Sequence, residues 1–206
     1  IAVAGLGTVG AGLVRLVTER ADDLSLRAGR AIEITAVSAR DRTADRGVDI
    51  SSYAWYDDPL GLAATDDVDV VVELIGGSDG IAKSLTEAAF ENGKYVVTAN
   101  KALVAHHGTA LAHAAEAAGV SFSYEAAVAG GIPIIKSLRE GLAANGLERV
   151  YGILNGTCNY ILTAMSEQGR EFEDILSECQ KLGYAEADPT FDIDGIDAAH
   201  KLAILT

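Results

Sequence analysis

"IAVAGLGTVGAGLVRLV", residues 1–17, is the stretch that decides the fold. A short apolar run is followed at once by Gly5, Gly7 and Gly10, and then by apolar residues at helical spacing. This order predicts a β-strand, a tight turn and a helix. In a G-x-G-x-x-G turn the first glycine makes the turn, the second lets the backbone approach a pyrophosphate, and the third allows close packing of helix and strand. The stretch therefore predicts a dinucleotide site, although a glycine turn without a ligand is the alternative.

Strands and helices alternate further along the chain. Their sequence patterns predict strands at residues 31–39, 68–75, 94–99 and 120–127, and helices at residues 80–93 and 102–119. Alternation of this kind is typical of an α/β protein with a doubly wound parallel sheet, the Rossmann type. Ligands of such sheets bind outside the carboxyl ends of the strands.

The character of the sequence changes after residue 130. The glycine-rich segment "VAGGIP", residues 128–133, predicts a hinge between a dinucleotide-binding domain at residues 1–130 and a smaller α/β region at residues 131–206. Residues 129–165 predict a helix, a strand and a second helix. The first predicted strand begins at the first residue and the last predicted helix runs to the last, so we expect the intact protein to be longer.

Composition excludes several classes of partner. The chain has 30 acidic and 16 basic residues and a formal net charge of −14, whereas nucleic acids and anionic membrane surfaces are bound by basic patches. No apolar run is long enough to span a bilayer and no signal peptide is apparent. Cys158 and Cys179 lie in no metal-ligand spacing and are expected to be reduced thiols, which predicts a cytoplasmic protein.

The end of the second predicted strand bears on the choice of cofactor. An Asp or Glu at this position binds the ribose hydroxyls of NAD, and an arginine accommodates the 2′-phosphate of NADP. The sequence "SARDR" offers Arg40 first and Asp41 behind it. It favours NADP slightly and keeps NAD possible, while Arg42 and Arg46 could equally belong to a solvated charge cluster.

Two lysines are candidates for proton transfer. Lys101 follows the predicted strand 94–99, and Lys201 ends the segment "DIDGIDAAHK", four residues after Asp197. Residues four apart lie on one face of a helix, and a surface ion pair of little energetic value is the simple alternative. A lysine whose pKa is lowered can exchange a proton with an alcohol or a carbonyl. Glu186 and Asp197 could then hold a substrate ammonium group, or the acidic loop around them could be merely solvated.

The chain resembles the homoserine dehydrogenases over essentially its whole length. The resemblance rests on the motifs "GLGTVG", "VVELIGG", "TANKALVA", "YEAAVAGGIPII", "GILNGTCNYILT" and "KLGYAEADPTFDIDGIDAAHKLAIL", in that order. It implies an NAD(P)-dependent oxidoreductase that interconverts L-homoserine and L-aspartate 4-semialdehyde, on the route to threonine and methionine.

The resemblance also implies roles for particular residues. Lys201 and Lys101 are the implied catalytic residues, and Glu186 and Asp197 the implied substrate-binding residues. The implied cofactor residues are Gly5, Leu6, Gly7, Thr8, Val9, Gly10, Arg40, Lys101 and Gly183. A monovalent cation, Na⁺, is implied at Glu125, Val128, Gly130 and Ile132, held largely by backbone oxygens.

The resemblance further implies a homodimer formed through residues 131–206, the region that also carries Lys201 and the implied substrate-binding residues. Two other hypotheses are weaker. An aspartate-semialdehyde dehydrogenase needs an activated cysteine nucleophile, and neither cysteine has such a setting. A nucleotide-binding sensor without catalytic activity would need the glycine turn but not the combination of Lys101, Glu186, Asp197 and Lys201.

Overall fold

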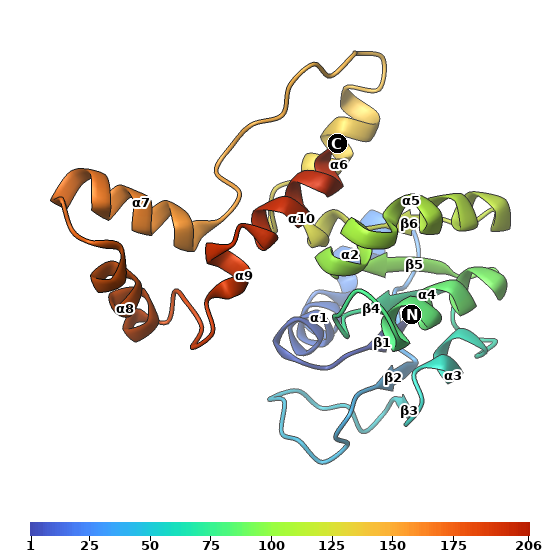
Figure 1. Cartoon of the computed structure of the whole chain (residues 1–206). Helices are drawn as coiled ribbons and strands as arrows, with labels where there is room; N and C mark the ends of the chain where they lie inside the picture. Colours follow the sequence, from blue (N-terminus) through green and yellow to red (C-terminus); the bar gives the residue numbers. More distant parts are fainter. The chain divides into compact units, whose positions relative to one another are not determined.

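The computed structural model describes all 206 residues, which form two compact units, Ile1–Pro133 and Ile134–Thr206 (Figure 1). Each unit is described by itself. The sequence placed the boundary after residue 130, within the same glycine-rich segment.

The first unit is built on a six-stranded parallel sheet. Its strands are β1 (Ala2–Ala4), β2 (Ala36–Ser38), β3 (Ala54–Trp55), β4 (Val70–Glu73), β5 (Tyr95–Thr98) and β6 (Phe122–Ser123), in the spatial order β3-β2-β1-β4-β5-β6. The chain builds outward from β1 in one direction and from β4 in the other, so β1 and β4 border the switch point at which ligands bind in this fold. This confirms the predicted Rossmann-type sheet.

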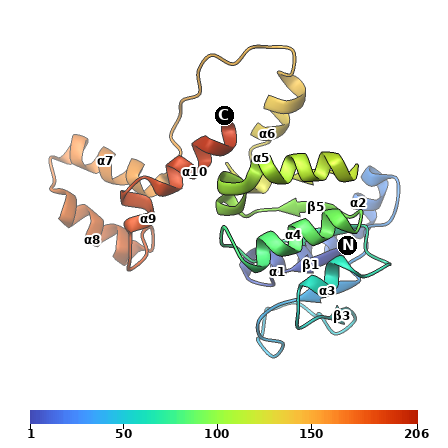
Figure 2. The ribbon, with the colours of Figure 1, turned by 45° about the vertical axis from the view of Figure 1, so that its right-hand side comes forward.

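Helices cover both faces of the sheet. They are α1 (Thr8–Glu19), α2 (Ala21–Ala28), α3 (Leu60–Ala63), α4 (Ile81–Glu91) and α5 (Lys101–Ala118), and a 3₁₀ turn, η1 (Glu125–Ala127), follows β6. Helices α4 and α5 lie side by side on one face, and α1 lies on the other (Figures 1 and 2). Apolar residues of α1, among them Val14 and Val17, pack on Val3 of β1 and Val37 of β2. Burial of this apolar stripe is what fixes α1 against the strand that precedes the glycine turn.

Five elements of this unit differ from the sequence prediction. The strands expected at residues 31–39 and 120–127 are limited to 36–38 and 122–123, and none of α2, α3 and β3 was predicted. Helix α2 is only eight residues long and has no buried residue, so its apolar pattern is too short to reveal a helix. Ion pairs of Asp23 with Arg20 and Arg27 accompany it instead. Strand β3 is two residues long, too short for an alternating pattern.

The second unit consists of helices. They are α6 (Ile134–Lys136), which continues into a π-helical turn, η2 (Ser137–Gly141), then α7 (Gly156–Gln168), α8 (Phe172–Leu182), α9 (Thr190–Ile193) and α10 (Ile196–Leu205). Helices α7 and α8 pack side by side (Figures 1 and 2). Ile161 and Ala164 of α7 form a small core with Ile175 and Cys179 of α8. None of the helices in either unit combines the length and apolar character needed to cross a bilayer.

The strand predicted within residues 129–165 is absent. Residues 146–155 have no regular secondary structure, and Tyr151 and Ile153 are 87% and 76% exposed. A strand needs a neighbouring strand to satisfy its backbone N–H and C=O groups, and residues 134–206 contain none. The region expected to be a smaller α/β unit is therefore helical in this structure.

Candidate active site

The three glycines of the turn after β1 have different roles, some in folding and one in ligand binding. Gly5 has φ +101°, and a Cβ added there would lie 2.5 Å from the carbonyl oxygen of Leu74. A Cβ added at Gly10 would lie 2.0 Å from the carbonyl oxygen of Gly5. Gly7, by contrast, has open space within 4 Å of such a Cβ. The first and third glycines are thus required by packing, whereas the second leaves room for a ligand at the backbone.

A pocket of about 440 Å³ opens beside this turn. It is lined by Gly5, Leu6 and Gly7, by residues at the end of β2, and by the loop after β4. No side chain caps the N-terminus of α1, which begins at Thr8 and includes Val9 and Gly10 in its first turn, so its backbone N–H groups are available to an anion. The predicted cofactor loop therefore forms a site that suits the phosphates of a dinucleotide.

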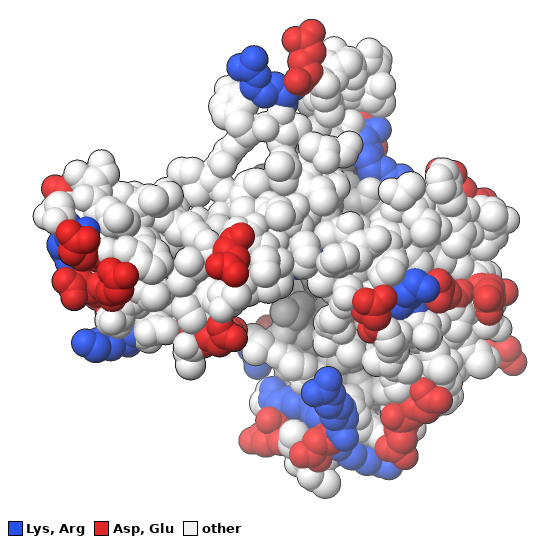
Figure 3. Space-filling view, in the orientation of Figure 1, with Lys and Arg blue, Asp and Glu red and all other residues white.

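Basic side chains gather at one edge of this pocket. Arg40 lines it, is exposed and makes no hydrogen bond or ion pair. Arg46, which also lines it, donates from Nε to the carbonyl oxygen of Leu6 at 3.2 Å. The guanidinium groups of Arg42 and Arg46 lie 5.7 and 5.8 Å from the centre of the Trp55 ring. Figure 3 shows lysine and arginine side chains gathered on this part of the unit, where the loop after β2 lies in Figure 1.

Asp41 is occupied within its own turn. Its Oδ1 accepts hydrogen bonds from the hydroxyl of Thr43 at 2.7 Å and from the backbone N–H of Thr43 at 2.8 Å. These two hydrogen bonds hold the pKa of Asp41 below its usual value, and the bond from the hydroxyl has the larger effect. The carboxylate expected to suit NAD is therefore engaged in the loop, whereas Arg40 is available to a ligand.

A buried polar network ties the ends of β4 and β5 together. The fully buried carboxylate of Glu73 accepts hydrogen bonds from the Thr98 hydroxyl at 2.6 Å and from the Ile75 N–H at 2.7 Å. The side chain of Asn100 caps α5 and donates to the carbonyl oxygen of Gly77 at 2.7 Å. Lys101, the first residue of α5, is half-buried and directly follows the capping residue Asn100. Sequence analysis missed Glu73. The available signal was an acidic residue at the end of an otherwise apolar strand.

In the second unit the predicted pair of Asp197 and Lys201 is formed. The Lys201 ammonium donates to Asp197 Oδ2 at 2.7 Å and to the carbonyl oxygen of Leu154 at 2.7 Å. The side chain of Asp197 is 4% exposed and that of Lys201 is 24% exposed. Because the Asp197 carboxylate is buried, this is not a solvated surface pair. Each hydrogen bond of the carboxylate is electrostatically stronger there than it would be in water.

Two further residues complete this cluster, and sequence analysis missed both in these roles. Asn155, which caps α7, donates from Nδ2 to Asp192 Oδ1 at 2.7 Å and to Asp197 Oδ2 at 2.8 Å. Asp192 belongs to α9, and Asp197 to α10. The available signal was the Asn-Gly-Thr sequence at a helix start, which predicts a cap but not which side chains the cap reaches.

Cys158 lies beside the same cluster. Its thiol donates to the carbonyl oxygen of Asp192 at 3.1 Å. Burial, and then the nearby carboxylates of Asp192 and Asp197, raise the pKa of the thiol. A cysteine in such surroundings is a poor nucleophile at neutral pH, which argues against covalent thiol chemistry.

Glu186 and Gly183 are less engaged. The carboxylate of Glu186 is exposed and makes no contact with Asp197 or Lys201, and only the backbone oxygen of Glu186 is used, by Gln180 Nε2 at 3.2 Å. Gly183 ends α8 with φ +77°. The roles predicted for these two residues stay predictions.

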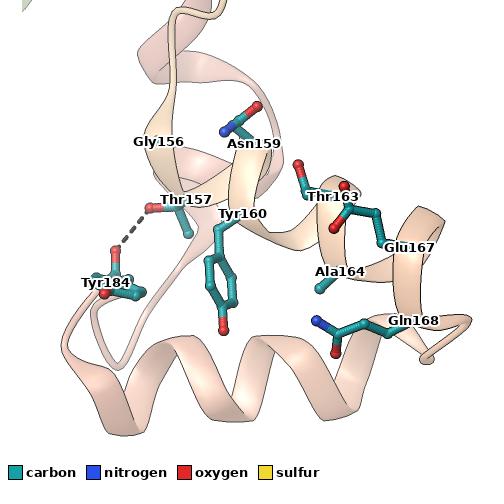
Figure 4. A pocket seen from close by; sticks show the side chains of 9 residues that line it. All are labelled: Gly156, Thr157, Asn159, Tyr160, Thr163, Ala164, Glu167, Gln168 and Tyr184. Atoms are coloured by element: carbon teal, nitrogen blue, oxygen red, sulfur yellow. Dashed lines mark hydrogen bonds between the residues drawn. The ribbon is translucent and has the colours of Figure 1, made fainter.

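A second hollow, of about 670 Å³, lies along α7 (Figure 4). It begins at Gly156 and Thr157, directly after Asn155, and includes Tyr160 and Tyr184. The Thr157 hydroxyl donates to the backbone oxygen of Tyr184 at 2.8 Å. None of the residues that sequence analysis singled out lines it.

The segment predicted to bind a cation makes a sharp turn. Ala129 has φ +48° and Gly131 has φ +84°, and the N–H of Ile132 donates to the carbonyl oxygen of Ala129 at 2.9 Å. The turn brings the backbone of Val128 to Ile132 together. No group of three or more His, Cys, Asp or Glu side chains is placed to hold a metal ion. The predicted ligands are largely backbone oxygens, so they stay a prediction.

Comparison with protein families decides the relationship. Residues 5–125 match the model described as "Homoserine dehydrogenase, NAD binding domain", and residues 133–206 match the model described as "Homoserine dehydrogenase". The chain belongs to the homoserine dehydrogenase family. Because the matches include the second region as well as the nucleotide-binding domain, a sensor module without catalytic function is not supported.

Individual homoserine dehydrogenases agree with this assignment. That of Neisseria gonorrhoeae is 52% identical over 206 residues, which are 100% of this chain and 47% of the relative. The crystal structure of a homoserine dehydrogenase from Thiobacillus denitrificans is 50% identical, with a TM-score of 0.91 over 99% of this chain and 47% of that one. The chain thus spans about half the length of these homoserine dehydrogenases.

A hyperthermophilic archaeal homoserine dehydrogenase whose structure is in complex with NADPH is 27% identical. Its TM-score is 0.83 over 99% of this chain and 67% of that one.

Proposed function

We propose that the full-length protein is an NAD(P)-dependent homoserine dehydrogenase, which interconverts L-homoserine and L-aspartate 4-semialdehyde in threonine and methionine biosynthesis. The observation that carries the proposal is the buried pair of Asp197 and Lys201, in a region that matches the homoserine dehydrogenase family. The glycine turn and its pocket, in the region that matches the family's NAD-binding domain, supply the nucleotide site.

Each polar group has a defined task in this reaction. Lys201 takes the hydroxyl proton of homoserine during oxidation and returns it during reduction of the aldehyde. Asp197 holds Lys201 in place, and with Glu186 it attracts the substrate ammonium. Lys101, at the carboxyl end of β5, contributes to cofactor binding and proton transfer. The bound nicotinamide supplies the hydride transfer itself.

The test is oxidation of L-homoserine by the full-length protein, followed by absorbance of the reduced nicotinamide, with NAD and NADP in parallel. We expect homoserine-dependent reduction of the cofactor that is absent with L-threonine or L-serine at equal concentration. Nucleotide binding without any turnover of homoserine would contradict the proposal.

Cofactor preference is expected to depend on Arg40, which is free to meet a 2′-phosphate while Asp41 is engaged by Thr43. Arg40→Ala should lower kcat/KM for NADP about 10- to 100-fold, since a hydrogen bond to a charged group contributes about 1.5–3 kcal/mol. The value for NAD should change little. Steady-state kinetics with both cofactors measure this difference.

Arg42→Ala is the matched control, because Arg42 stacks on Trp55 and does not line the pocket. It should leave the ratio of the two kcat/KM values nearly unchanged. Equal losses with NAD and NADP in Arg40→Ala would show that Arg40 does not read the 2′-phosphate.

We further propose a cytoplasmic homodimer that forms through residues 131–206, and a monovalent cation such as Na⁺ at the turn of Glu125, Val128, Gly130 and Ile132. The positive φ of Ala129 supports the cation site, since strained backbone of this kind persists at ligand-binding turns.

A further inference from the structure

We propose that Asn155 is a positioning residue: its side-chain amide holds the carboxylates of Asp192 and Asp197 together and thereby fixes the place of the Lys201 ammonium. The inference rests on the proposed function for its effect on catalysis. Its structural part, the joining of two carboxylates by one amide, can be tested without activity.

Every polar atom of this amide is used. Asn155 Oδ1 accepts from the N–H of Cys158 at 2.7 Å, and Nδ2 donates one hydrogen to Asp192 and the other to Asp197. A flipped amide would turn its oxygen toward both carboxylates and its NH₂ group toward an N–H donor. The orientation is therefore fixed by chemistry, because carboxylates only accept hydrogen bonds and a backbone N–H only donates.

The amide connects three elements that are separate in the sequence. Asn155 precedes α7, Asp192 lies in α9 and Asp197 in α10. Lys201 stands one turn after Asp197 and also donates to the carbonyl oxygen of Leu154, the residue before Asn155. Both contacts that hold the ammonium thus depend on where residues 154 and 155 place their polar atoms.

The amide also sets the charge of the cluster. Two carboxylates that share a hydrogen-bonding partner repel each other, and a neutral double donor holds them together without adding a positive charge. The carboxylates of Asp192 and Asp197 and the ammonium of Lys201 together leave an excess of one negative charge, which suits a substrate that carries an ammonium group. An arginine or lysine in place of Asn155 would cancel that excess.

Asn155 could be only a helix cap, so the test must separate capping from bridging. Asn155→Asp keeps the shape and the capping oxygen, and Asn and Asp are about equally good caps. It replaces the double donor by a third carboxylate. Asn155→Ser also keeps a capping oxygen, but it removes the bridge without adding charge. Asn145→Asp, at an exposed position of the same unit, controls for the added charge alone.

The first measurement is thermal unfolding of the full-length variants between pH 5 and pH 8. In Asn155→Asp, the neighbouring carboxylates of Asp192 and Asp197 raise the folded-state pKa of the introduced carboxyl above its unfolded value of about 3.9. A raised folded pKa means that stability present at low pH is lost as pH rises through that pKa. We expect the melting temperature of Asn155→Asp to fall increasingly below wild type as pH rises. The deficits of Asn155→Ser and Asn145→Asp should not depend on pH.

The second measurement is the pH profile of kcat for homoserine oxidation. A third carboxylate favours the protonated form of Lys201, so the profile of Asn155→Asp should move about one pH unit to higher pH, with kcat at pH 8 at least 10-fold lower. Asn155→Ser should lower kcat without that displacement. The dissociation constant for the nucleotide should stay at the wild-type value in both.

The outcomes are distinct. A pH-independent stability deficit that is the same in Asn155→Asp and Asn155→Ser, with an unmoved kcat profile, reduces Asn155 to a cap and overturns the inference. Wild-type protein without homoserine oxidation overturns the proposed function, and the stability series then still decides whether Asn155 joins the two carboxylates.

Discussion

Lys201→Ala is expected to lower kcat for homoserine oxidation by about 10³-fold, because proton transfer by a positioned side chain typically contributes 10²–10⁴-fold. The substitution removes the ammonium that bonds to Asp197 and to the carbonyl oxygen of Leu154, at the end of the cluster where the substrate hydroxyl is proposed to react. Stopped assays at high enzyme concentration measure the residual rate. Nucleotide titration should give the wild-type dissociation constant.

Lys181→Ala is the matched control, since Lys181 is an exposed lysine of α8 in the same unit. It should retain wild-type kcat. Circular dichroism of Lys201→Ala checks that the fold survives the loss of the partner of Asp197. Wild-type turnover in a folded Lys201→Ala protein would refute the assignment of Lys201 as the proton-transfer group.

Gly10→Ala is expected to have the largest effect on folding, a loss of about 3 kcal/mol or more in the free energy of unfolding. The added methyl group would meet the carbonyl oxygen of Gly5 at 2.0 Å, and that oxygen belongs to the backbone and cannot rotate away. Overpacking of flexible side chains alone costs about 1–3 kcal/mol. Urea unfolding of the full-length protein measures the change.

Gly7→Ala separates the roles of the two glycines. The added methyl group meets no protein atom within 4 Å, so stability should stay within about 0.5 kcal/mol of wild type. The methyl group would occupy the space that the pyrophosphate approaches, and nucleotide affinity should fall. A stable Gly10→Ala protein would refute the packing role of Gly10, and a Gly7→Ala protein with normal nucleotide affinity would show that the turn does not bind the cofactor as proposed.

Local signals predicted much of the first unit. The apolar run before the glycine turn and the alternation of strands and helices are encoded within a few residues each. Helix α2 and strand β3 were missed because each is too short to show a clear apolar period. The prediction of a strand within residues 129–165 was wrong for another reason. The sequence there suits an extended chain, but a strand also needs a neighbouring strand to pair with. Local sequence does not reveal whether that neighbour is present.

The sequence by itself determined the glycine turn, the family and the spacing that pairs Asp197 with Lys201, because each depends on neighbours along the chain or within one helical turn. Only the tertiary structure decided that the pair is buried, that Asn155 joins Asp197 to Asp192, and that Glu73 locks the ends of β4 and β5. Those contacts join residues 25 to 42 positions apart. A hydrogen bond depends on the distance between two atoms in space, and over such separations that distance is set by how the helices and strands pack.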